Sequence, residues 1–104
     1  MALPPTDIAL TDAFEAGRFE ARVDGELAGF LEYTVKYGRI ALIHTEVYPH
    51  YERRGIATGL IRYGLDQARA RRLLVIPICP FVKDYVNRHP EDDDIMVGRV
   101  RPSV

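Results

Sequence analysis

The stretch VYPHYERRGIA, residues 47–57, joins a run of β-branched residues to a run with helical periodicity. Upstream, residues 39–47 are rich in Val, Ile and Thr, which favours a strand that stops before Pro49. Downstream, the apolar side chains of residues 56–71 recur at intervals of three and four, which predicts an amphipathic helix. The segment therefore marks a strand-to-helix junction with a glycine, Gly55, at the helix start.

This junction has the chemistry of an anion site. The first turn of a helix leaves backbone N–H groups without intrahelical partners, and the helix dipole adds about half a positive charge there. Gly55 lets a ligand approach the backbone, and Arg53 and Arg54 add charge that can fork onto phosphate oxygens. From these residues alone, a phosphate or pyrophosphate cradle and an ordinary turn with two surface arginines remain equally open.

Three strands precede the junction. Apolar and polar residues alternate over 18–23 and 27–36, and 39–47 forms the third strand. The pair Asp24-Gly25 suits a type I′ turn, and Tyr37-Gly38 makes the second turn, so we expect an antiparallel meander. Residues 1–17 form a weakly patterned N-terminal arm, in which Ile8-Ala9-Leu10 is either a short strand or an ordered part of the arm.

A strand and a short helix follow the long helix. Residues 73–78 are apolar throughout, and Pro77 should break the pairing of this strand. Pro80 suits the first turn of a helix that ends at His89-Pro90. Gly64 lies on the apolar face of the long helix, where we expect close packing on the sheet. The order β-β-β-α-β-α predicts an α/β (α+β) mixed sheet whose last two strands are parallel.

Composition limits the possible classes. The chain has 104 residues, 47% hydrophobic and 28% charged, with a net charge of −1, so we expect one globular domain without a general affinity for nucleic acid or anionic lipid. One cysteine, Cys79, excludes an internal disulfide and favours a reducing compartment. No apolar run could span a bilayer, and residues 1–7 do not resemble a signal peptide, so we expect a cytoplasmic protein.

The charged clusters have simple interpretations. The acidic run 91–94 is typical of a solvated segment, and residues 92–104 should form a loose C-terminal tail. The basic run 69–72 lies at the end of a helix, where cations complement the helix dipole. It has no aromatic stacking motif beside it, so we do not expect it to bind nucleic acid. His50 and His89 fit no metal-ligand spacing, so we expect no metal site.

Residues 52–57, Glu-Arg-Arg-Gly-Ile-Ala, resemble the acetyl-CoA pyrophosphate loop of the GCN5-related N-acetyltransferases, whose pattern is Gln/Arg-x-x-Gly-x-Gly/Ala. Glu52 departs from the first position, but a backbone cradle does not depend on that side chain. Further matching segments are residues 25–33, 44–47, 77–82 and 89–91, together with Tyr85. The resemblance covers residues 18–91 and is to a small, single-domain branch of the family.

The resemblance implies a sheet that splays between the strand ending at Val47 and the strand ending near Cys79, with acetyl-CoA in the gap. The pantetheine arm would pair with the backbone of residues 45–47. The chain is too short for the N-terminal helical pair of larger relatives, so the acceptor side should be open. The residues assigned to acetyl-CoA are Thr45, Glu46, Val47, Arg53, Arg54, Gly55, Ile56, Ala57, Phe81 and Val82.

Three residues are candidates for catalysis. Tyr85 is either the general acid for the departing thiolate, which a phenol with a pKa of about 10 would suit, or a core aromatic. Cys79 is an acetyl-accepting nucleophile, a pocket-lining group or a small buried hydrophobe. His44 is either the general base or a structural residue, and Glu46 is no stronger a candidate for the base than His44. We favour direct transfer with few protein groups.

Two functions therefore remain in view. One is a small acetyl-CoA-dependent N-acetyltransferase that acts on an unidentified amine. The other is a non-catalytic acyl-CoA-binding or protein-interaction module with the same fold. In either case the expected ligand is acetyl-CoA, and we expect binding to neither nucleic acid nor a membrane. The chain should be a monomer or a weak homodimer.

Overall fold

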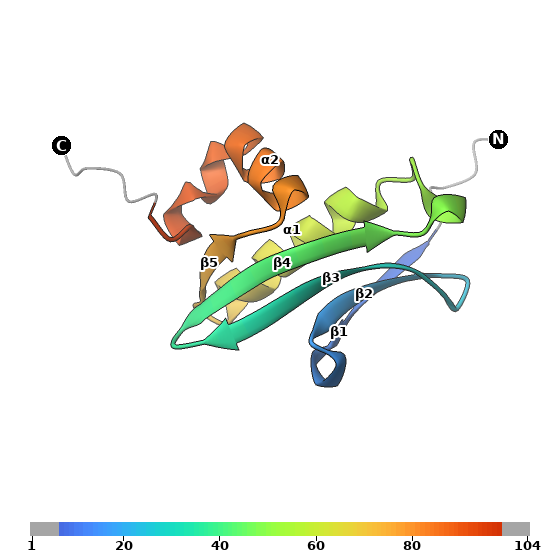
Figure 1. The fold of residues 1–104 in the computed structure, drawn as a ribbon, viewed down its shortest axis with the longest axis horizontal. Coiled ribbons are helices and arrows are strands. Elements are labelled where there is room, and N and C mark those ends of the chain that lie inside the picture. The colour runs from blue at the N-terminus through green and yellow to red at the C-terminus, as the bar shows by residue number, and fades with distance from the viewer. Residues whose placement is uncertain (1–6, 99–104) are drawn as a thin grey trace.

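The computed structural model describes residues 7–98 and contains one mixed sheet with two α-helices (Figure 1). The strands are β1 Ile8–Ala13, β2 Arg18–Val23, β3 Glu26–Lys36, β4 Arg39–Val47 and β5 Leu74–Pro77. The helices are α1 Ile56–Ala70 and α2 Pro80–Arg88, with short 3₁₀ turns η1 Phe14–Ala16, η2 Pro49–Tyr51 and η3 Pro90–Ile95.

The sheet has the order β1-β2-β3-β4-β5. Its first four strands are antiparallel neighbours, and β5 runs parallel to β4 with α1 as the crossover. The predicted mixed sheet, the meander and the parallel pair are confirmed. Asp24 and Gly25 have φ angles of 51° and 82°, as a type I′ turn between β2 and β3 requires.

The N-terminal residues add a strand to the predicted order. Of the two alternatives for residues 8–10, the strand is confirmed, and it continues to Ala13. β1 pairs with β2 over its whole length, from Ile8 opposite Val23 to Ala13 opposite Arg18. The first six residues of the predicted arm, with most of the segment considered as a signal peptide, lie outside the described residues.

The predicted loose tail is wrong for its first residues. Ile95 and Met96 are buried in the core, and the N–H group of Val97 donates to the carbonyl of Val75 at 2.9 Å. Asp92 is only 3% exposed, so the acidic run is not a fully solvated segment. The reason is that two arginines of α1 neutralise Asp92, as the ion pairs described below show. Residues 99–104 lie outside the described part.

One core joins the sheet to both helices. In Figure 1 helix α1 lies behind the sheet, and no helix lies in front of β2, β3 and β4. A Cβ atom on Gly64 would lie 3.3 Å from side-chain carbons of Leu31 and Phe19, which confirms that α1 packs closely on the sheet at this glycine. Among residues 7–98 no helix is both long and apolar enough to cross a membrane.

Candidate active site

The sheet divides between β4 and β5. The two strands pair only from Arg39 opposite Leu74 to Leu42 opposite Pro77. Pro77 has no N–H to donate, and the N–H groups of Ile78 and Cys79 both donate to the Leu42 carbonyl, at 3.0 and 2.9 Å. Beyond this point β4 runs on to Val47 without a β5 partner, because the segment that follows β5 turns away and forms α2. The free edge of β4 therefore borders a gap.

A bulge sets which side chains of β4 face this gap. The β3–β4 register places Glu32 opposite His44 and Tyr33 opposite Leu42, so Ile43 is an extra residue in β4. Thr45 is consequently buried, whereas the side chains of His44 and Glu46 are about half exposed. Thr45 therefore lies on the opposite face of β4 from His44 and Glu46, as the alternation of side chains along a strand requires.

The loop between β4 and α1 has the backbone of an anion cradle. Gly55 caps α1 with φ at 76°, and Arg53 also has a positive φ, 65°. The first hydrogen bond of the helix runs from the N–H of Gly59 to the carbonyl of Gly55 at 2.9 Å. The preceding N–H groups of the first turn are therefore available to a ligand. Nothing lies within 4 Å of a Cβ placed on Gly55, so this approach is open.

A pocket of about 480 Å³ joins this loop to the free edge of β4. Its size is within the range of small-molecule and cofactor sites. The lining residues are Thr45, Glu46, Val47, Tyr51, Glu52, Arg53, Gly55, Ile56, Ala57, Thr58 and Phe81. The structure thus brings together most of the residues that the sequence assigned to acetyl-CoA.

Three lining residues are not among those assigned to acetyl-CoA: Glu52, which belongs to the matched loop pattern, and Tyr51 and Thr58, which do not. Thr58 could have been found, because it is the third residue of the same helical turn as Ile56 and Ala57. Tyr51 carried no such pattern, since its burial depends on a contact with Glu26, 25 residues away in the chain.

Two residues assigned to acetyl-CoA lie elsewhere. The guanidinium of Arg54 stands over the ring of Tyr51, 5.6 Å from its centroid, and does not line the pocket. Val82 is fully buried in the core, and its backbone N–H points to the thiol of Cys79. Neither residue therefore lines the pocket, and their assignment to acetyl-CoA stays a prediction.

Cys79 lies at the point where the sheet divides. Its side chain is 1% exposed, and its Sγ is 3.3 Å from the Oγ1 of Thr45. Burial alone would raise the pKa of the thiol, but hydrogen bonds from Thr45 and from the N–H groups of Val82 and Phe81 outweigh it and lower the pKa. The first turn of α2 therefore supplies the thiol with N–H donors.

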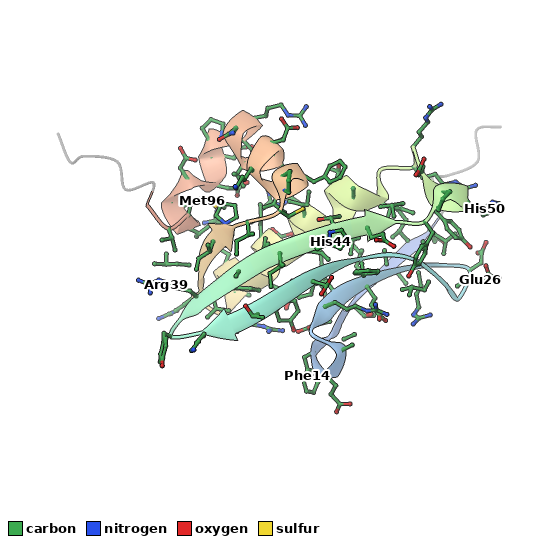
Figure 2. The ribbon with its side chains drawn as sticks, in the orientation of Figure 1. Phe14, Glu26, Arg39, His44, His50 and Met96 are labelled. Atoms are coloured by element: carbon green, nitrogen blue, oxygen red, sulfur yellow. The ribbon has the colours of Figure 1, made fainter. Side chains whose placement is uncertain are left out.

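Like Cys79, the two other catalytic candidates are not in the pocket lining. Tyr85 is 7% exposed, accepts a hydrogen bond from Nη1 of Arg62 at 3.3 Å and stacks on the ring of His89. His44 lies on β4, as Figure 2 shows, and its Nε2 is 3.2 Å from a carboxylate oxygen of Glu46. Among residues 7–98 no group of three or more His, Cys, Asp or Glu side chains could hold a metal ion.

Known structures share this architecture. A GCN5-like protein from Staphylococcus aureus matches with a TM-score of 0.64 and 19% identity, over 92% of each chain. A ribosomal-protein-alanine N-acetyltransferase from Brucella melitensis matches with a TM-score of 0.59 and 22% identity, over 97% of each chain. Ard1 from Thermoplasma volcanium matches with a TM-score of 0.53 and 19% identity, but the match spans 60% of this chain and only 43% of Ard1. At these identities the likeness establishes the fold.

A family model identifies the chain at the level of sequence. No curated protein sequence matches the chain. The model for GCN5-related N-acetyl-transferase matches residues 18–95, which run from the first residue of β2 to the last residue of η3. The match includes the gap, the loop and the whole pocket lining. The chain therefore belongs to the GCN5-related N-acetyltransferase family.

Proposed function

We propose that this protein transfers an acetyl group from acetyl-CoA to an amine acceptor. The observation that carries the proposal is the pocket, which connects the open N-terminus of α1 with the unpaired edge of β4. One end of such a pocket suits phosphate and the other suits an amide-containing chain. Acetyl-CoA has both parts in one molecule.

The residues present fit this ligand. The first-turn N–H groups of α1 would take the pyrophosphate, and Gly55 leaves room for it. Arg53 lines the same pocket and would add positive charge. The backbone of residues 45–47 would hydrogen-bond to the amides of the pantetheine arm as an added strand.

When bound, acetyl-CoA supplies an activated carbonyl that a neutral amine can attack. The edge of β4 would hold the acetyl end beside Thr45, with the Cys79 thiol in contact with that residue at 3.3 Å. We assign Cys79 to a supporting position behind Thr45, which itself lines the pocket, and prefer direct transfer. Tyr85 remains the candidate acid, because Arg62 donates to its oxygen and leaves the phenolic proton free to be donated.

The acceptor would approach over the face of the sheet opposite α1, which no helix covers among the described residues (Figure 1). His44 and Glu46 are exposed on β4 and are the base candidates on this side. One observation favours the alternative, a non-catalytic acyl-CoA-binding module: Tyr85 does not line the pocket.

An amine screen separates the two functions. The protein is incubated with acetyl-CoA and a panel of small amines and N-terminal or lysine-containing peptides, and release of free thiol is followed. Amine-dependent thiol release, with an acetylated product of the expected mass, would support the transferase. Tight CoA binding without release for any amine would instead support the module. Tyr85→Phe then tests the acid, and a large fall in turnover without loss of CoA binding is expected.

A further inference from the structure

The cradle loop is an exposed segment held between two buried residues. Residues 52–55 are all exposed, whereas Tyr51 before them is 9% exposed and Ile56 after them is 1% exposed. Arg53 holds a left-handed backbone that residues with a side chain rarely adopt. Such a conformation persists only where the surroundings hold it. The two buried ends must therefore fix the loop.

The anchors at the two ends differ in kind. Ile56 is an aliphatic residue of the core and belongs to α1. Tyr51 is held by a polar contact, because its hydroxyl donates to Oε2 of Glu26 at 2.8 Å. By accepting this bond the Glu26 carboxylate raises the pKa of the Tyr51 phenol above its ordinary value. The guanidinium of Arg54 also lies over the ring of Tyr51, 5.6 Å from the ring centroid.

Glu26 reaches Tyr51 because β3 extends past the end of β4. The last pair between these strands is Gly29 with Val47, so residues 26–28 project beyond β4. There the carbonyl of Ala28 accepts a hydrogen bond from the N–H of Tyr48 at 2.9 Å. Figure 2 shows Glu26 at the same end of the molecule as His50, which precedes Tyr51. The β2–β3 hairpin thus supports the loop from outside the pocket.

We propose that the hydrogen bond between Tyr51 and Glu26 positions residues 52–55 for the pyrophosphate of acetyl-CoA, which makes Tyr51 a positioning residue of this site. The inference rests on the proposed function. With the bond intact the loop is preorganised, and the ligand does not have to order it. Without the bond only a fraction of the molecules has the binding conformation, and the apparent affinity falls by that fraction.

The test compares the two tyrosines of the segment between β4 and α1, Tyr48 and Tyr51. Tyr51→Phe removes the hydroxyl that donates to Glu26, and Tyr48→Phe removes a hydroxyl for which residues 7–98 offer no hydrogen bond. The dissociation constant of CoA, measured by calorimetry, should rise about three- to tenfold for Tyr51→Phe, as expected for one partly exposed hydrogen bond to a charged group. It should stay at the wild-type value for Tyr48→Phe.

Glu26, which accepts this hydrogen bond, gives a second test. Glu26→Leu should match Tyr51→Phe, and the double variant should bind CoA no more weakly than either single one, because both remove the same bond. Glu26→Gln keeps an acceptor oxygen and should restore part of the affinity. Acetyl-pantetheine, which has no pyrophosphate, should bind all these variants as it binds the wild type. Where turnover is measurable, KM for acetyl-CoA should rise and kcat should not change.

Three outcomes would overturn the inference. Tyr51→Phe could bind CoA as tightly as Tyr48→Phe, or the effects of Tyr51→Phe and Glu26→Leu could add in the double variant. CoA and acetyl-pantetheine could also weaken by the same factor, which would mean that the variant is destabilised as a whole. A wild-type protein that does not bind CoA would instead overturn the proposed function, and with it this inference.

Discussion

The thiol of Cys79 lies 3.3 Å from the hydroxyl of Thr45, at the point where β4 and β5 part. Thr45 is buried because the bulge at Ile43 turns it inward, and Cys79 is buried because it precedes the first turn of α2. The contact therefore links the free edge of β4 to α2. It places the only cysteine of the chain at the inner wall of the gap.

Cys79→Ala should retain acetyl transfer within about tenfold of the wild type, because in direct transfer the thiol only packs behind Thr45, which lines the pocket. Cys79→Ser is the matched control, since it keeps a hydrogen-bonding group toward Thr45. Intact mass spectrometry of the wild type after exposure to acetyl-CoA should show no stoichiometric adduct. A hydroxylamine-sensitive acetyl adduct that an amine discharges, with loss of transfer by orders of magnitude in Cys79→Ala, would establish a covalent route.

Gly55→Asp should weaken CoA binding by at least about tenfold, because it puts a negative side chain against the pyrophosphate. Gly55→Asn is the matched control: Asn has nearly the same shape and, like Asp, tolerates the left-handed backbone that Gly55 holds at φ 76°. Calorimetry should find the Asp variant weaker than the Asn variant. Equal affinity in wild type and a folded Gly55→Asp protein would contradict the assignment of the loop.

Asp92 fixes the C-terminal segment to α1. Its two carboxylate oxygens accept hydrogen bonds from Arg62 at 2.9 Å and from Arg69 at 3.1 Å, and its side chain is only 4% exposed. Burial alone would raise the pKa of Asp92, but the two arginines outweigh it and hold the pKa below its ordinary value. Asp92 therefore contributes stability above its unfolded pKa of about 3.9, and this contribution is lost as the pH falls through the lower, folded pKa.

Asp92→Asn should destabilise the protein by about 1–3 kcal/mol at pH 7, since the charged hydrogen bonds are weakened. For a domain of this size that corresponds to a fall in Tm of about 5–15 °C. Thermal melts at pH 7, 5 and 3 should show the difference from wild type shrinking below about pH 4, where Asp92 of the unfolded state becomes protonated while folded Asp92, with its lowered pKa, is still ionised.

Asp84→Asn is the control for this series. Asp84 pairs with Arg88 one helical turn away, with both side chains about two-thirds exposed, so the loss should stay below about 1 kcal/mol. A deficit for Asp92→Asn that persists undiminished at pH 3 would show that the ion pairs are not its cause.

Local patterns predicted the elements around the site. The positive φ angles at Asp24-Gly25, the break at Pro77 and the close packing at Gly64 each follow from one residue type in one kind of element, which a sequence reveals directly. The anion cradle was predicted from a local pattern as well, because a glycine at a helix start can be recognised without knowing what surrounds it.

Contacts between distant residues were not predictable. Asp92 stands in a run of acidic residues, and only the folded chain brings Arg62 and Arg69 to it. The buried position of Tyr51 likewise depends on Glu26, and Ile43 gives no sign of the bulge that it forms in β4. Each of these features depends on tertiary packing, whereas patterning and turn chemistry are local.

A melting series with ligands tests the central claim, that the pocket at the start of α1 binds acetyl-CoA. The pocket exists only in the folded chain, so at about 100 times the dissociation constant the stabilisation is roughly 2.7 kcal/mol, which corresponds to a rise in Tm on the order of 10 °C. Acetyl-CoA and CoA should both give this shift, and it should grow with the logarithm of concentration. Pantetheine should give much less, because it lacks the groups that the helix N-terminus and Arg53 would hold. A Tm that does not move in millimolar acetyl-CoA would contradict the account.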